Sequence, residues 1–115
     1  MRFDKFTARF QESLTQAESL ASANQNSIIE SEHFLLALLE SEDGLIRSIL
    51  AQVGVKVEPL KNDLQKLILN FPRIADVTDT AISPSFKRLL IETEKLSISK
   101  NDQYVSTELF LLSAV

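Results

Sequence analysis

The sequence predicts an all-α fold in which two pseudo-symmetric helical repeats pack into one domain, with the second repeat truncated at its carboxyl end. The first observation is an internal similarity, because "SEHFLLALLE" at residues 31–40 is repeated in similar form as "TELFLLSAV" at residues 107–115. The second is that, at an offset of 76 positions, the match extends without a gap over both segments and the helical stretches before them. An internal duplication explains this better than chance similarity between helices. Identical pairs include Phe10 and Phe86, Leu14 and Leu90, Glu18 and Glu94, Leu20 and Leu96, Glu32 and Glu108, and Phe34 and Phe110.

The first repeat contains four segments with helical periodicity. A helix is expected over about residues 4–24, where apolar residues recur every three or four positions and Asp4 or Thr7 can cap the start. A second helix is expected to open at Ser31 and to stop at Gly44, and a third covers residues 45–53. A fourth follows Val57 and ends at "FP". Its apolar stripe consists of Leu60, Leu64, Leu67 and Ile68.

The second repeat begins after a connector. Residues 72–82 lack helical periodicity and carry turn-forming residues. Ser83 and Pro84 then give a cap followed by proline at the first helical position, which predicts a helix to about residue 100. Thr107 is expected to open a sixth helix that reaches Val115.

These elements define the expected domain organisation. One domain covers residues 1–115, with repeat one at about 4–71, the connector at about 72–82 and a partial repeat two at about 83–115. Since repeat two stops inside its last helix, we expect the chain to be a piece of a longer protein in which a counterpart of residues 40–70 follows.

Composition narrows the functional classes. With 115 residues, 44% of them hydrophobic, the chain is long enough for one core. Its net charge of -4 makes nucleic acid a poor partner, and its short apolar runs fall far below the roughly 20 residues that span a membrane. Asp4 and Arg9 interrupt any signal-peptide stretch, so we expect a cytoplasmic protein. The chain has no cysteine for a disulfide or thiolate metal site, and its two glycines do not form a phosphate-binding loop.

Matched positions that differ in polarity indicate a possible binding surface. Repeat two is more apolar where Ser13, Thr15, Ser22 and His33 correspond to Leu89, Ile91, Ile98 and Leu109. One interpretation is that these residues cover the fourth helix. The other is that some of them, Leu109 above all, line an apolar groove that binds extended apolar polypeptide.

No catalytic or metal-binding constellation is recognisable. His33 is the single histidine, stands at a helix start, and is expected to hydrogen-bond a neighbour. Glu92 and Glu94 lie two positions apart on a helix, so they point to different faces and do not form an acid–base pair.

The stretches "MRFDKFTARFQESLTQAESLA", "IIESEHFLLALLE", "LAQVGV" and "YVSTELFLLSAV" together resemble the amino-terminal Clp repeat domain of ClpB-type protein disaggregases. The resemblance covers the whole chain. It implies a domain without enzymatic activity or cofactor of its own, joined to two ATPase modules that would hold ATP and Mg²⁺. It also implies a homohexamer that works with the DnaK system and captures exposed hydrophobic segments of unfolded or aggregated proteins for delivery to the ring pore.

The same resemblance implies a set of binding residues. Its sensitive polar positions correspond to Thr7, Asp102 and Glu108, and its apolar groove to Leu90 and Leu109. Structural roles compete with two of these assignments, because Thr7 can be a helix cap and Glu108 a helix-start charge. Relatives in this family often have an apolar residue at the position of Glu92, so this sequence departs from the family pattern there.

Two other readings stay open beside substrate capture. The ClpA and ClpC relatives share the repeat but dock dedicated adaptor proteins, which would require a polar, shape-specific surface. An enzyme is the third reading, for which the sequence offers no site. Within the substrate-capture reading, Leu109→Ser is expected to weaken binding of unfolded chains and to leave the fold intact.

Overall fold

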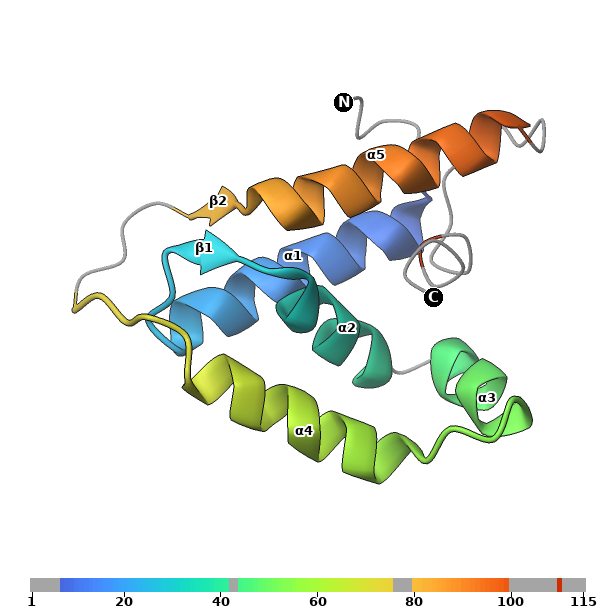
Figure 1. The fold of residues 1–115 in the computed structure, drawn as a ribbon, viewed down its shortest axis with the longest axis horizontal. Helices are drawn as coiled ribbons and strands as arrows, with labels where there is room; N and C mark the ends of the chain where they lie inside the picture. Colours follow the sequence, from blue (N-terminus) through green and yellow to red (C-terminus); the bar gives the residue numbers. More distant parts are fainter. Residues whose placement is uncertain (1–6, 42–43, 76–79, 100–109, 111–115) are drawn as a thin grey trace.

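The computed structural model describes residues 7–41, 44–75, 80–99 and 110, and within these residues the fold is helical (Figure 1). The elements in chain order are α1 (Ala8–Ala23), β1 (Ile28–Ile29), α2 (Ser31–Leu39), α3 (Leu45–Gln52), α4 (Val57–Leu69), β2 (Ala81–Ile82) and α5 (Pro84–Ser99). Helix α2 packs against α1 on one side and α4 on the other. The all-α prediction is confirmed, and the sixth predicted helix lies outside the described residues except for Phe110, which is helical.

Three helix starts follow from local chemistry. The Thr7 hydroxyl accepts a hydrogen bond from the Phe10 N–H at 3.2 Å, which satisfies one of the exposed amides of α1. Ser83 does the same for α5, since its hydroxyl accepts from the Phe86 N–H at 3.1 Å and Pro84 is the first helical residue. At α4, Pro59 lies in the first turn as predicted.

One expectation about the ends of α2 is corrected and the other is confirmed. Helix α2 ends at Leu39 rather than at Gly44, and Gly44, with φ of 67°, is instead the residue that precedes α3. Its left-handed backbone is a conformation that glycine adopts without a steric penalty. The start of α2 is confirmed, because Ser31 is its first residue; the N-cap is Glu30, which forms a capping box with His33.

The apolar stripe of α4 is narrower than predicted. Leu64 and Ile68 are buried and Leu60 is half-buried, but Leu67 has 51% of its surface exposed. Helix α4 buries one face against α2, and Leu67 lies off that face.

A short parallel strand pair joins the two repeats. Ile28 pairs with Ala81 and Ile29 with Ile82, and the Ser83 N–H donates to the Ile29 carbonyl at 3.0 Å. The last residues of the predicted connector therefore form β2 rather than a loop. Because α5 starts directly after β2, this pairing fixes where the second repeat begins relative to the first.

The core centres on four buried phenylalanines, Phe10, Phe34, Phe86 and Phe110. The duplication relates Phe10 to Phe86 and Phe34 to Phe110, and ring distances occur in corresponding sets. Ring centroids within a repeat are 5.0 Å apart for Phe10 and Phe34 and 6.0 Å apart for Phe86 and Phe110. Between repeats, Phe34 lies 5.5 Å from Phe86 and Phe10 lies 6.1 Å from Phe110. The rings of Phe34 and Phe110 meet at 4.6 Å, as expected for related residues beside a pseudo-two-fold axis.

Candidate functional site

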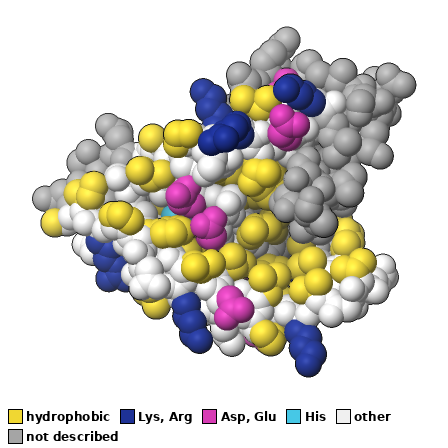
Figure 2. Space-filling model, in the orientation of Figure 1, with side chains coloured by type: hydrophobic (Ala, Val, Ile, Leu, Met, Phe, Trp, Pro, Cys, Tyr) yellow, Lys and Arg dark blue, Asp and Glu magenta, His cyan; other side chains and the backbone are white. Residues whose placement is uncertain are grey.

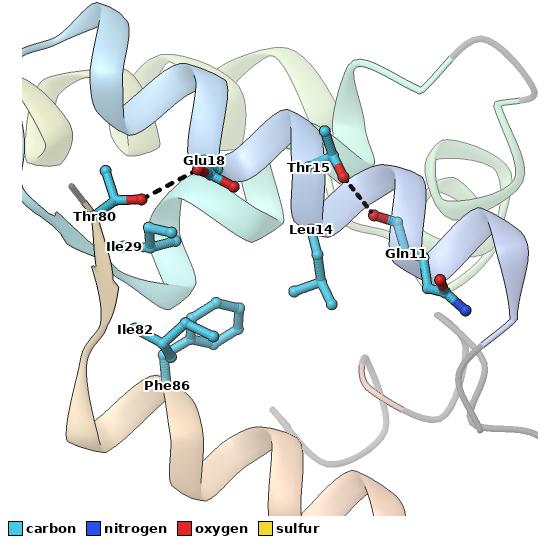
Figure 3. Close-up of a pocket in the computed structure, with 8 residues that line it drawn as sticks. All are labelled: Gln11, Leu14, Thr15, Glu18, Ile29, Thr80, Ile82 and Phe86. Carbon is cyan, nitrogen blue, oxygen red and sulfur yellow. Dashed lines mark hydrogen bonds between the residues drawn. The ribbon is translucent and has the colours of Figure 1, made fainter. Parts of the chain in front are cut away.

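A surface pocket of about 370 Å³ opens between α1 and the β2–α5 segment, where the two repeats meet (Figure 3). Four of its residues come from α1, and the other four from the strand pair, the residue before β2 and the first turn of α5. They are Gln11, Leu14, Thr15, Glu18, Ile29, Thr80, Ile82 and Phe86. The pocket therefore depends on both repeats.

Helical spacing explains why α1 contributes these residues. Gln11, Leu14, Thr15 and Glu18 are separated by three, one and three positions, which places them along one face of the helix. An adjacent face of α1, about 100° around the helix axis, is buried through Phe10, Ala17 and Ala21. The pocket face is consequently free to carry mixed polar and apolar side chains.

The pocket has an apolar floor and a polar rim. Phe86 is fully buried and Ile29 is 7% exposed, while Leu14 and Ile82 are half-buried beside them. At one end of the pocket the Thr80 hydroxyl donates to Glu18 Oε1 at 3.3 Å (Figure 3). Glu18 is the single charged residue among the eight that line the pocket. Such a site offers apolar contact together with one carboxylate, and it lacks the paired groups of acid–base catalysis.

The structure places the predicted binding residues in different environments. Thr7 is the cap of α1, one turn before Gln11, so it begins the helix that forms one pocket wall. Leu90 is fully buried in the core, one turn after Phe86, which favours a packing role for its side chain over an exposed groove position. Asp102, Glu108 and Leu109 lie outside the described residues, so their part in a groove stays a prediction.

His33 belongs to a buried hydrogen-bond network at the start of α2. Its Nδ1 accepts from the Glu30 N–H at 2.9 Å, so the ring proton resides on Nε2 and is donated to Asn26 Oδ1 at 3.0 Å. Burial lowers the pKa of His33, and the carboxylates of Glu32 and Glu30 oppose this by favouring the charged ring. The prediction that this histidine hydrogen-bonds a neighbour is confirmed. Among the described residues, no group of three His, Cys, Asp or Glu side chains is placed to hold a metal ion.

A second hollow, of about 400 Å³, lies beside α4. Leu20, Leu36, Ile68 and Leu69 line it together with polar residues at its margin. Figure 2 shows hydrophobic side chains gathered over α3 and α4 in the lower part of the view, and Leu69 is 58% exposed.

In the described part of the chain no helix is long and apolar enough to cross a membrane.

None of the eight residues that line the pocket was among the predicted binding residues, and three of them, Ile29, Thr80 and Ile82, belong to the strand pair or directly precede it. The signal available was the β-branched character of these residues, since Ile and Thr are enriched in strands. Two-residue strands show no alternation, however, so the pairing that brings Ile29 next to Ile82 was not predictable from periodicity.

Comparisons with known proteins agree with this architecture. A family model described as the Clp repeat (R) N-terminal domain matches residues 5–115. The chaperone protein ClpB of Pseudomonas putida is 38% identical over 116 residues, and the alignment covers 100% of this chain. The chain spans only 14% of the length of that relative.

Solved structures show the same fold. The N-domain of ClpV from Vibrio cholerae has a TM-score of 0.84 and 26% identity, with 97% of this chain and 67% of that chain covered. A complex of the ClpV N-domain with a VipB peptide has a TM-score of 0.83 and 28% identity, covering 97% of this chain and 68% of that chain. Since the family model extends over nearly all of the sequence and the ClpB relative aligns along its entire length, this chain belongs to the Clp repeat N-terminal domain family.

Proposed function

We propose that this chain is the non-catalytic, substrate-binding domain of a ClpB-type disaggregase, which captures exposed hydrophobic segments of unfolded or aggregated proteins. The observation that carries the proposal is the open pocket with an apolar floor at the junction of the two repeats. The similar ClpV N-domain in complex with a VipB peptide supports a polypeptide as the occupant.

The rest of the machine lies outside this chain, which corresponds to 14% of the ClpB relative. In the proposal, ATP and Mg²⁺ bind in ATPase modules elsewhere in the longer protein, and the domain itself needs no cofactor. The longer protein forms a homohexamer in the cytoplasm, works with the DnaK system, and passes captured segments to its central pore.

The energetics suit transient capture. Each buried methylene contributes about 0.8 kcal/mol before the cost of ordering the chain. A pocket of about 370 Å³ lies near the small end of the roughly 300–1,000 Å³ range of ligand pockets, so it accommodates one or two side chains. Binding is therefore weak and tolerant of sequence, which allows release to the pore.

An adaptor-docking domain is the second candidate function. The observation that favours it is the ClpV complex, because its peptide comes from one named protein rather than from a mixture of unfolded chains. Docking predicts saturable binding to one folded partner, whereas substrate capture predicts binding to many unfolded chains and to few folded ones.

An NMR titration of the isotope-labelled chain with a permanently unfolded polypeptide tests the leading proposal. Localised, saturable shifts of the Leu14, Thr15, Thr80 and Ile82 amides are the expected result. The same spectra follow the amides of the predicted groove residues Leu90, Asp102, Glu108 and Leu109. The Leu109→Ser variant then distinguishes the two sites, because it should weaken binding in the predicted groove and leave binding in the pocket unchanged. If all these amides stay unshifted in excess polypeptide, substrate capture is rejected and a search for one folded partner in a pull-down follows.

A further inference from the structure

The pocket between α1 and β2–α5 is electrically asymmetric along its length. Glu18 and Thr80 lie at one end and Gln11 at the other, with the apolar floor between them (Figure 3). Glu18 is exposed, and the hydrogen bond from Thr80 holds its carboxylate at the rim. A carboxylate has about four lone-pair sites, so accepting one bond from Thr80 leaves capacity for a cation.

Lys87 and Arg88, the basic residues next to Phe86 in the sequence, do not neutralise the Glu18 end of the pocket. Lys87 and Arg88 are exposed and follow Phe86 by one and two residues. Residues one or two apart on a helix point in different directions, so they leave the face on which Phe86 meets the pocket. Neither lines the pocket.

We propose that the pocket selects polypeptide segments in which a large apolar side chain lies within two residues of a Lys or Arg. The apolar side chain packs against Leu14 and Ile82, the half-buried side chains beside the buried Ile29 and Phe86, and the cation pairs with Glu18. The inference rests on the proposed function, because it names the class of segment that the substrate-binding site prefers. It also gives the bound segment a direction, since the cation must lie at the Thr80 end.

Selection of this kind is modest by its physics. An exposed carboxylate–cation pair typically contributes little because water and salt screen it, and it corresponds to a preference of about two- to five-fold in the dissociation constant. It should decline as ionic strength rises. The apolar contact supplies most of the affinity, and the carboxylate discriminates among apolar segments.

The test uses three labelled, disordered peptides with the same central leucine flanked by Lys, Gln or Glu. Their dissociation constants for the 115-residue chain are measured by fluorescence anisotropy at low and at physiological salt. Glu18→Gln and Glu18→Lys are compared with Glu12→Gln, an exposed carboxylate on the same helix that does not line this pocket. This control is required because a net charge of -4 attracts any cationic peptide to some degree, and Glu12→Gln changes the net charge as much as Glu18→Gln does.

The expected result is that the wild-type chain prefers the Lys peptide over the Gln peptide by about two- to five-fold. Glu18→Gln should remove that preference, Glu18→Lys should shift it to the Glu peptide, and Glu12→Gln should behave as wild type. Equal binding of the Lys and Gln peptides, or equal losses in Glu18→Gln and Glu12→Gln, would overturn the inference while leaving substrate binding in place.

A pocket-filling variant locates the binding. Thr15 is exposed at the pocket rim, so Thr15→Trp is expected to weaken all three peptides while circular dichroism shows unchanged helix content. Wild-type affinity in Thr15→Trp would place the peptides elsewhere and reject the inference. Absence of binding by any peptide to the wild-type chain would instead reject the proposed function itself.

Discussion

At the scale of single residues, His33 connects three segments that are distant in sequence. Its Nε2 donates to Asn26, whose side-chain amide donates to the Pro72 carbonyl at 2.9 Å. The Asn24 amide donates to Asn26 Oδ1 and to the Ile68 carbonyl, and thus joins the end of α1 to the end of α4. The Phe71 ring covers the imidazole at a centroid distance of 5.4 Å. Satisfied buried polar groups of this kind hold segments in one arrangement, because breaking one bond leaves a buried partner unpaired.

This network predicts a pH-dependent stability. The pKa of His33 is lowered by burial, so between the folded and unfolded pKa values the unfolded chain binds more protons. The contribution of His33 is therefore complete above its ordinary pKa of 6.5 and is lost as the pH falls below it. Protonation at Nδ1 would also place an N–H against the Glu30 N–H.

Urea unfolding at about pH 7.5 and pH 5.5 measures the effect. We expect wild type to lose more stability on acidification than His33→Gln, by at most about 1.4 kcal/mol one pH unit below the unfolded pKa. The Glu30 and Glu32 carboxylates beside position 33, and Arg73, which bonds Asn24, are present in both proteins, so the two proteins differ only in the side chain at position 33. Identical pH dependence in the two proteins would show that His33 does not titrate across this range.

At the scale of the elements, predictability follows the strength of local signals. The starts of α4 and α5 were predictable because proline in the first turn, and a serine cap at α5, are specified by adjacent residues. The end of α2 was not, because Gly44 fits a helix stop in sequence but serves here to begin α3. The strand pair was missed because its partners are distant in sequence and each strand has only two residues.

Helix α1 provides a test that separates capping from binding. Thr7→Ala removes the hydrogen bond to the Phe10 N–H and is expected to cost about 0.5–2 kcal/mol of unfolding free energy, measured by urea denaturation. Thr7→Ser keeps the hydroxyl and should retain most of that stability. Thr15→Ala, which removes an exposed hydroxyl from the helix interior, is the control and should change stability little. Peptide binding that fails in the stable Thr7→Ser variant would indicate a direct binding role for the threonine methyl group.

At the scale of the whole molecule, the phenylalanine cluster makes the two repeats one structural unit. Phe34 contacts rings from its own repeat and from the other, since Phe10, Phe86 and Phe110 all lie within 5.5 Å of it by centroid distance. The duplication in the sequence predicted that equivalent phenylalanines exist in both repeats. It did not predict that they meet, because similarity between repeats specifies each repeat and not the interface between them.

Truncation of the central ring should therefore weaken both repeats together. Phe34→Ala is expected to cost about 3–5 kcal/mol, measured by denaturant unfolding. In native-state hydrogen exchange, the slowest amides of α1 and α5 should lose protection by the same free energy. Leu69→Ala, at a 58% exposed position on α4, is the control that should leave both helices protected. Loss of protection in α1 with α5 unchanged would mean that the repeats unfold independently.

The candidate site was predictable only in its general position. The family resemblance implied binding residues in both repeats, and two of them, Thr7 as the cap of α1 and Leu90 on α5, belong to the two helices that flank the pocket. Burial of Leu90 could not be read from the sequence, because an apolar residue fits a core and a groove equally well. A role for the Glu18 carboxylate could not be predicted from the repeats, because Glu94 occupies the matching position of repeat two and the pair shows no difference in polarity.

The pairing of β1 with β2 has a consequence for the chain while it is being synthesised. Helices α1 to α4 lie within residues 8–69, so their mutual contacts become possible before Ala81 and Ile82 leave the ribosome. Until then Ile29 has no strand partner, and Phe34 lacks the rings that Phe86 and Phe110 later provide. A nascent copy of this domain thus exposes the same kind of apolar surface that the finished domain is proposed to capture. Until residues 81–110 have been synthesised, it therefore resembles the unfolded proteins that it is proposed to bind.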